Sequence, residues 1–445
     1  MKAKDDLFTL VRSLQQTEKR YFKVFASQNE KQGSNIYLKL FDAIDQQREY
    51  NEKAIREKFR KEHFIKHLAA TKYYLQKLII KSLTIYHNNN SVAIRLNNVL
   101  TSIEILFNKG LFDLCLKLIV RSKYIASHKE SYIHYIELLR WEKKVMLRKQ
   151  FTNAEGDQVS NITGEEKDAM KKLSNMQDYQ NIHMNWWYQV NKKGTSRSAL
   201  DSKPYALIKA DPLVKDIRRA LTNRSMITYY NINTVIGRES GDMKTSILFR
   251  EKAVDLFLKN PGLAEREPES CITSVSNLAL GYYFLKQYKR SIQVTDQIKT
   301  MLDPRSYKDS EIIQTMVLES TISNKASCFN RLGDLKNVIA LIPEFETGRK
   351  KLARTINKAR CMIIIYNFSC AFLGIGDHKK ALRWVNEILH DHSPENEQDV
   401  HAFARIIHLI IHYEMKNEEL LEYIVRSTYR YFYKRNRLYK LNPAY

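Results

Sequence analysis

Residues 369–381 read SCAFLGIGDHKKA, and this stretch decides the fold that the sequence predicts. Ser369 and Phe372 stand at helical spacing, Gly376-Asp377 interrupts the pattern, and Ala381 then opens a second apolar run. Glycine takes a positive φ at little cost and is therefore common just after the end of a helix. Small residues also let two antiparallel helices approach closely. The stretch therefore predicts a helical hairpin.

The same arrangement occurs four times along the chain. Turns of this kind stand at residues 241, 286, 333 and 376, which are 45, 47 and 43 residues apart. Each is followed by a small or branched residue and then by a proline, in the pairs Ser246 and Pro261, Ser291 and Pro304, Val338 and Pro343, and Ala381 and Pro394. A weaker copy surrounds Gly110. Because repetition at a regular interval is typical of repeat architectures, we expect an all-α fold, an α-solenoid over residues 91–394.

These residues resemble the tetratricopeptide repeat. That family has a small residue and then a ring in its first helix, Gly-Asp-Tyr at the turn, Ala in its second helix and Pro at the exit. The best match here is Ser369, Phe372, Gly376, Ala381 and Pro394. The resemblance implies stacked helical hairpins with a groove that can hold a peptide or a partner's helix. Since the intervals exceed the family's period of about 34 residues, we expect longer helices or joints.

Basic residues concentrate toward the two ends of the chain. The net charge is +24, and residues 51–150 carry 20 Lys and Arg against 8 Asp and Glu, whereas residues 251–400 carry 21 against 19. Such a field attracts nucleic acid or an anionic surface. We therefore expect three parts: a basic helical N-terminal cap at 1–90, the solenoid at 91–394, and C-terminal helices at 395–445.

The last predicted helix interleaves basic and aromatic residues, with no acid from residue 423 to residue 440. At 100° per residue, its apolar face holds Leu420, Leu421, Ile424, Thr428, Tyr431 and Phe432. Cations that neutralise phosphates, beside rings that stack on bases, are typical of nucleic-acid binding. The candidate nucleic-acid contacts here are Arg426, Tyr429, Arg430, Tyr433, Lys434, Arg435, Arg437 and Lys440. The other interpretation is a solvated cationic face whose tyrosines seal the end of the array.

The N-terminal cap offers a second basic face. Over residues 66–86, Lys66, Lys77 and Lys81 share a helix face with two tyrosines, opposite a leucine-rich face. We add these three lysines to the candidate nucleic-acid contacts. The helices predicted at 52–59 and 66–86 also allow a helix-turn-helix that reads DNA, which is a weaker alternative than a cap with a basic outer face.

The densest aromatic cluster is Trp186, Trp187 and Tyr188, with His183 nearby. These three aromatic residues are candidate partner-binding residues for a protein ligand. The alternative is that consecutive rings point around a helix and pack between layers, and this structural interpretation is the one we favour.

The whole chain also resembles an uncharacterised family of bacterial helical-repeat proteins. The resemblance rests on residues 402–407, 411–414, 426–430 and 434–437, which include the basic and aromatic residues of the last helix. It implies a helical-repeat fold and a cytoplasmic setting. It does not indicate an activity.

Motifs for catalysis, cofactors and metals are missing from the sequence. There is no GxxxxGK, GxGxxG, HExxH or GxSxG, and no Cys/His spacing typical of zinc. His63 and His67 lack a third ligand, so we interpret them as surface residues. The five cysteines form no CxxC pair, which favours reduced thiols in the cytoplasm. We expect no enzyme, no cofactor and no metal.

Two functions of different classes follow from these observations. The leading hypothesis is a non-catalytic protein that binds structured RNA, ribosomal RNA above all, through the cap helix and the last helix. The alternative is a protein-protein interaction scaffold that holds a partner in the groove of the array.

Overall fold

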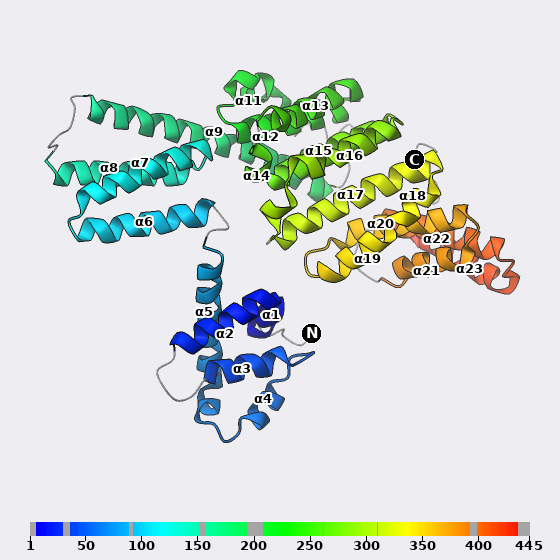
Figure 1. The fold of residues 1–445 in the computed structure, drawn as a ribbon. Coiled ribbons are helices and arrows are strands. Elements are labelled where there is room, and N and C mark those ends of the chain that lie inside the picture. The colour runs from blue at the N-terminus through cyan, green and yellow to red at the C-terminus, as the bar shows by residue number, and fades with distance from the viewer. Residues whose placement is uncertain are drawn as a thin grey trace. The chain divides into compact units, whose positions relative to one another are not determined.

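The computed structural model describes residues 6–29, 36–88, 92–150, 157–193, 208–260, 262–308, 310–391 and 398–434. Within these residues the regular structure is entirely helical, with 22 α-helices and no strand (Figure 1). Consecutive helices pack against each other, which confirms an all-α fold consistent with an α-solenoid. The chain divides into two compact units, residues 1–170 and 171–445. The sequence suggested three parts, and that division stays a prediction.

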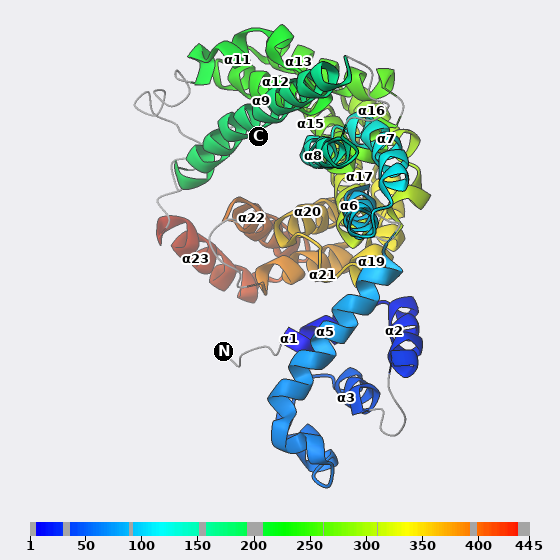
Figure 2. The ribbon, with the colours of Figure 1, turned by 90° about the vertical axis from the view of Figure 1, so that its left-hand side faces the viewer.

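The first helices of unit 1 form a small body with its own core. They are α1 (Asp6–Ser13), α2 (Gln16–Asn29), α3 (Ile36–Asp45), α4 (Glu52–Lys58), η1 (His63–His67) and α5 (Leu68–Tyr86). Helices α1, α2 and α3 pack along α5 (Figures 1 and 2). Phe22, Phe41 and Leu75 are fully buried in a cluster whose members all lie between Leu7 and Leu83. This body corresponds to the predicted cap.

The rest of unit 1 consists of longer helices that follow each other as hairpins. They are α6 (Val92–Asn108), α7 (Phe112–His128), α8 (Tyr132–Arg148) and the first part of α9 (Gln158–Lys193), which continues into unit 2. Ile103, Cys115 and Ile119 are fully buried between them, and Phe107 packs edge-on against Trp141. The copy around Gly110 is therefore a real hairpin.

Unit 2 continues the pattern of helical pairs. Its elements after α9 include α11 (Pro212–Lys215), η3 (Ile217–Arg219), α12 (Asn223–Glu239), α13 (Met243–Lys259), α14 (Leu263–Arg266), α15 (Pro268–Phe284), α16 (Tyr288–Met301), η4 (Pro304–Tyr307), α17 (Glu311–Leu332), α18 (Leu335–Ala340), α19 (Ile342–Lys351), α20 (Lys358–Gly374), α21 (His378–Leu389), α22 (Gln398–Glu414) and α23 (Glu418–Lys434). Two buried clusters cover α12 to α17 and α17 to α22.

The turns between paired helices share one hydrogen-bond pattern. The N–H of Asp334 donates to the carbonyl of Phe329 across Gly333, and the N–H of Asp377 donates to the carbonyl of Phe372 across Gly376. The two glycines have φ of 73° and 79°, which is the left-handed conformation that closes a helix in this way. The same bond recurs around Lys286 and Lys416, whose φ values are 60° and 56°. The Lys416 turn was not predicted, and it makes α22 and α23 a further hairpin.

A second regular contact joins the two helices of a hairpin. The residue five positions after the turn lies beside the residue seven positions before it, and in four hairpins a hydrogen bond joins them: Cys115 Sγ to the Ile103 carbonyl at 3.6 Å, Ser246 Oγ to Thr234 at 2.8 Å, Ser291 Oγ to Ala279 at 2.7 Å, and Ser369 Oγ to Ala381 at 3.0 Å. In the hairpin around Gly333 these positions hold Ala326 and Val338, both fully buried. The small residues of the predicted repeat thus lie where the helices approach most closely.

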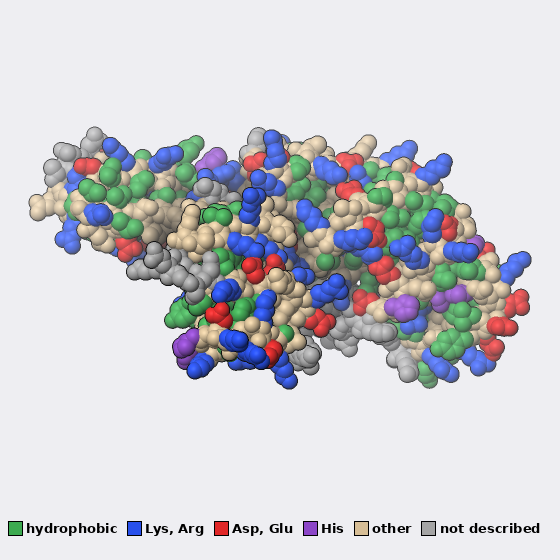
Figure 3. Space-filling view, turned by 60° about the horizontal axis from the view of Figure 1, so that its bottom comes forward, with side chains coloured by type: hydrophobic (Ala, Val, Ile, Leu, Met, Phe, Trp, Pro, Cys, Tyr) green, Lys and Arg blue, Asp and Glu red, His purple; other side chains and the backbone are tan. Residues whose placement is uncertain are grey.

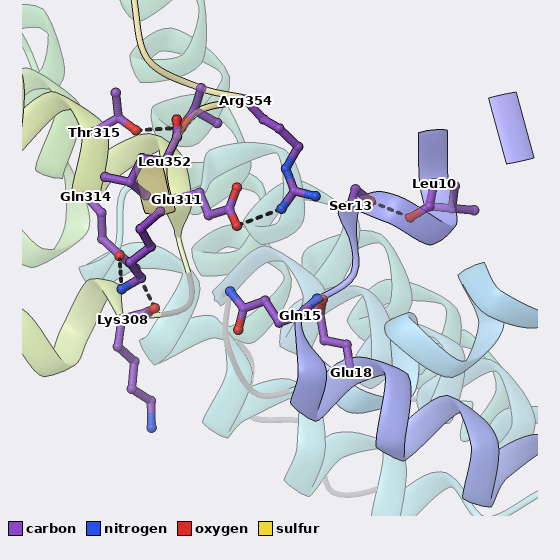
Figure 4. Close-up of polar contacts among 12 residues, drawn as sticks. Leu10, Ser13, Gln15, Glu18, Lys308, Glu311, Gln314, Thr315, Leu352 and Arg354 are labelled. Carbon is purple, nitrogen blue, oxygen red and sulfur yellow. Dashed lines mark hydrogen bonds and ion pairs between the residues drawn. The ribbon is translucent and has the colours of Figure 1, made fainter. Parts of the chain in front are cut away.

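Polar contacts fix helix α17 to the segment that precedes α20. Arg354 donates to the Glu311 carboxylate at 2.9 Å, and Thr315 Oγ1 lies 2.5 Å from Thr355 Oγ1 (Figure 4). One turn further, Glu319 accepts the backbone N–H of Asn357 at 2.5 Å. These contacts recur every four residues along one face of α17, so they hold this face in a fixed position beside α20.

None of the described helices is both long enough and apolar enough to cross a bilayer.

Candidate nucleic-acid interface

Helix α23 carries the C-terminal candidate residues on its exposed side. Ile424, Thr428 and Phe432 are buried at intervals of four residues, so they fix which side of the helix packs on the array. The buried face of α23 begins later along the helix than the sequence predicted. Leu420 was assigned to it and is 46% exposed, because it lies in the first turn of the helix, before the buried face begins.

Two tyrosines form an aromatic pair on the exposed side of α23. The rings of Tyr429 and Tyr433 are nearly parallel, at 16°, with centroids 6.2 Å apart. Their residues are 56% and 66% exposed. Arg430 lies beside them and is exposed, and no ion pair of Arg430 occurs among the described residues. The pair thus presents phenol rings next to a guanidinium, as the sequence predicted.

Arg426 forms an ion pair that the acid-free stretch around it did not predict. Its Nη2 lies 2.5 Å from the Glu422 carboxylate one turn earlier, and both side chains are well exposed. The acid-free stretch starts at residue 423, so it stops one residue short of this partner. Lys434 ends the helix and its side chain is not described, while Arg435, Arg437 and Lys440 lie outside the described residues.

The cap presents the second candidate face, in unit 1. Lys77 and Lys81 are exposed on α5, whereas Lys66 precedes the helix in η1. The ammonium of Lys77 lies 4.6 Å from the centroid of the Tyr73 ring, and this tyrosine raises the pKa of the lysine. Tyr73 and Tyr74 are both exposed and meet edge to face. The prediction of a basic-aromatic outer face on the cap therefore agrees with the side-chain positions.

Helix-turn-helix geometry gains no support from the cap. The segment between α4 and α5 is the 3₁₀ helix η1, not a tight turn, and α4 packs mainly on α3. His63 and His67 are both exposed in η1. In the part of the chain that the structure describes, no three His, Cys, Asp or Glu side chains are arranged to hold a metal.

The aromatic cluster near the end of α9 is split between the interior and the surface. Trp186 is 8% exposed, whereas Trp187 is 45% exposed and Tyr188 is also exposed. The Trp187 indole donates to His183 Nε2 at 3.1 Å. Burial lowers the pKa of His183, which keeps its ring neutral and able to accept this bond. Packing explains Trp186, and the two exposed rings remain candidate partner-binding residues.

Charge is mixed rather than segregated on much of the surface. Figure 3 shows Lys and Arg side chains spread over the drawn face, with Asp and Glu among them. Exposed ion pairs occur among the described residues, such as Lys39 with Glu62 at 3.0 Å and Arg56 with Glu52 at 2.8 Å. Exposed pairs contribute little to stability, about 0–1 kcal/mol each. The basic-aromatic faces of α5 and α23 therefore stand out by their rings as much as by their charge.

A pocket in unit 2 was not predicted. It has a volume of about 280 Å³ and lies between α15, α17 and α20. Its lining is rich in hydroxyl and amide groups, from Ser276, Asn277, Ser320, Ser323, Asn324 and Ser327. Asn277 and Asn324 each stand nine residues before their turns, at Lys286 and Gly333. This shared position in the repeat is a sequence feature from which the two asparagines could have been predicted to lie together.

The cysteines have the character of buried packing residues. Cys115, Cys271 and Cys328 are buried, and burial raises the pKa of Cys271 to about 12. The thiolate is the reactive form of cysteine, so a pKa in this range makes Cys271 a poor nucleophile.

Comparison of the chain with known protein families and with curated proteins gives no match.

Proposed function

We propose that this protein is a non-catalytic, tetratricopeptide-like helical-repeat protein that binds structured RNA in the bacterial cytoplasm, with ribosomal RNA as its target. The supporting observation is the exposed side of α23, where Tyr429 and Tyr433 stack beside Arg430. Unstacked bases of RNA loops pack on such rings, and guanidinium groups bind phosphates.

The packing of α23 supports the proposal, because the rings of Tyr429 and Tyr433 are more than half exposed and lie off the buried face of the helix. Ile424, Thr428 and Phe432 already fill the contact with the array. Two large aromatic side chains on the opposite side then expose apolar area to water, and such exposure is typical of binding surfaces. The face of α5, with Lys77 over Tyr73, repeats the same chemistry in unit 1.

The first experiment is a sucrose-gradient profile of cell lysate, probed for this protein with and without ribonuclease. Co-migration with ribosomal particles that is lost after nuclease treatment is the expected result. Migration as a small species in both samples would contradict the proposal.

A charge-reversal variant then locates the interface. Replacing Arg426, Arg430 and Lys434 by Glu is expected to lower RNA affinity and to flatten its dependence on salt. The matched control reverses Lys244, Lys336 and Lys379, which are exposed near the starts of α13, α18 and α21. It changes the net charge equally, and acids at helix starts are favourable. Equal loss of affinity in both variants would show that RNA binding depends on the net charge of the protein and not on the α23 face.

One observation favours a second candidate function, a protein-interaction scaffold. Trp187 and Tyr188 are exposed on α9, and exposed aromatic residues often anchor protein partners. Trp187→Ala should then abolish crosslinking to partner polypeptides while RNA binding is retained. Tyr124→Ala, which removes an exposed ring from α7, is the control. Loss of RNA binding alone in the Trp187 variant would reject this scaffold function.

A further inference from the structure

The pocket between α15, α17 and α20 contains polar groups that the fold itself does not satisfy. Ser276 Oγ and Asn324 Nδ2 are buried and have no hydrogen-bond partner among the described residues. Leaving a buried donor or acceptor unpaired destabilises a folded protein. Folded proteins pair most such groups with protein, water or a ligand, so these two atoms leave room in the pocket for a partner from outside the fold.

These groups belong to a repeated arrangement. Asn277 on α15 and Asn324 on α17 occupy the same register, each preceded by a serine that also lines the pocket. The two helices pack side by side (Figure 1). A side-chain amide both donates and accepts, which matches the edge of a nucleobase. The pocket therefore presents two equivalent amide-hydroxyl pairs on neighbouring helices.

The charged groups at the pocket are mainly cationic. Arg360 lines it, is exposed, and donates to Ser320 Oγ at 3.3 Å. Arg331 is also exposed and donates to the hydroxyl of Tyr283, another lining residue, at 3.0 Å. Arg250 is buried, and its Nη1 donates to the backbone carbonyl of the lining residue Asn277.

Among the described residues that line the pocket, one carries a carboxylate, and this carboxylate is already engaged. Glu319 accepts the backbone N–H of Asn357 and lies 4.0 Å from the Arg360 guanidinium. Its position is fixed by the row of contacts that holds α17 to the segment before α20. Among the described residues named here, three guanidinium groups, of which Arg360 alone lines the pocket, stand against this one carboxylate, and this balance favours an anionic ligand.

We propose that this pocket binds an unpaired nucleotide of single-stranded RNA. Asn277 and Asn324 contact the edge of the base, Tyr283 contacts its face, and Arg331 and Arg360 contact the phosphate. Amide edge readers, a ring and guanidinium groups are the combination that recognises a nucleotide, whereas a peptide main chain needs no cation. The inference rests on the proposed RNA function and adds a site in the array, apart from α23.

The test uses the full chain and measures fluorescence anisotropy with short single-stranded homopolymers of A, C and U and with a duplex RNA. The double variant Asn277→Ala, Asn324→Ala is expected to bind the single strands about tenfold more weakly and to bind the duplex unchanged. Asn337→Ala, an exposed asparagine on α18, is the matched control. Circular dichroism checks that each variant is folded.

The outcomes separate the two proposals. If the wild-type chain binds RNA and the folded double variant binds single strands equally well, the pocket inference is wrong and the proposed function stands. If the wild-type chain binds no RNA, the proposed function is wrong and the inference falls with it.

A second measurement does not depend on the variants. A 4-thiouridine oligoribonucleotide should crosslink to α15 or α17 on irradiation. Crosslinks confined to α5 and α23 would overturn the inference. So would protection of α15 and α17 from hydrogen exchange by an extended peptide but not by RNA, which would assign the pocket to a protein partner.

Discussion

The guanidinium of Arg426 lies 2.5 Å from the carboxylate of Glu422, one helical turn earlier on the exposed side of α23. An ion pair of this kind is weak in water, yet its carboxylate still repels an approaching phosphate. Arg430 makes no such pair among the described residues. The two arginines should therefore contribute unequally to RNA binding.

We expect Arg430→Glu to weaken RNA binding on the order of fivefold at moderate salt, and Arg426→Glu to weaken it less. Glu422→Gln should strengthen binding, because it removes the repulsion and releases Arg426. Fluorescence anisotropy at two salt concentrations measures all three. An Arg426 variant that loses as much affinity as the Arg430 variant would contradict this account of the ion pair.

Two asparagines at the same register should respond differently to truncation. Asn367 is buried, donates to the Ile363 carbonyl at 2.8 Å and to Ser327 Oγ, and accepts from Asn330. Asn367→Ala should therefore cost about 1–3 kcal/mol of unfolding free energy. Asn324→Ala should not lower it, because Nδ2 of Asn324 has no partner within the described part of the chain and the variant removes a buried unpaired donor.

Urea unfolding monitored by circular dichroism gives both values. A large destabilisation by Asn324→Ala would show that this side chain is part of the structure and weaken its assignment to a ligand.

Substitution of two helical glycines by alanine should change the stability of the protein in opposite directions. A Cβ on Gly237 in α12 would lie 2.8 Å from the backbone nitrogen of Ser246, because α12 and α13 approach closely there. A Cβ on Gly164 in α9 would meet nothing within 4 Å. Gly237→Ala should destabilise the protein by about 1–3 kcal/mol, and Gly164→Ala should stabilise it by up to about 1 kcal/mol. Differential scanning calorimetry compares the two, and a stabilising Gly237 variant would mean that the hairpin can open without cost.

Acid should destabilise unit 2 through His408. Burial lowers the pKa of His408 from 6.5 to about 4, with further contributions from His412, Arg405 and His390. Between these values the unfolded chain binds more protons than the folded one, so stability decreases as the pH falls from about 6.5 toward 4. Thermal unfolding across this range should show a falling midpoint, with a shallower slope in His408→Gln. The exposed His63→Gln is the control, and an unchanged slope in the His408 variant would exclude this residue as the cause.

The repeat was predictable because each turn and each close helix contact needs a particular type of residue at a fixed position in the sequence. Gly333 and Gly376 adopt the conformation for which glycine is chosen, and Ser246, Ser291 and Ala381 lie where two helices meet. The Lys416 turn escaped prediction because Leu409 and Leu421 occupy the positions where the Lys286 hairpin has Ala279 and Ser291, even though the hydrogen bond across the turn is the same.

The candidate site was predictable only in part. Helical periodicity placed Tyr429, Tyr433 and Lys77 on exposed faces, since the buried positions opposite them follow the same period. The partner of Arg426 was not predicted because Glu422 lies one residue before the acid-free stretch, one helical turn before Arg426. The pocket at Asn277 and Asn324 depends on three helices far apart in sequence, so periodicity within any one helix could not reveal it.

The buried cluster of the cap ends near Leu83, and this has a consequence for biosynthesis. A polypeptide emerges from its N-terminus, and parts with a self-contained core can fold before the remainder is made. The cap can therefore complete its packing while most of the chain is still untranslated. The lysines of α5 would then lie on a folded surface while the helices that follow are still being synthesised.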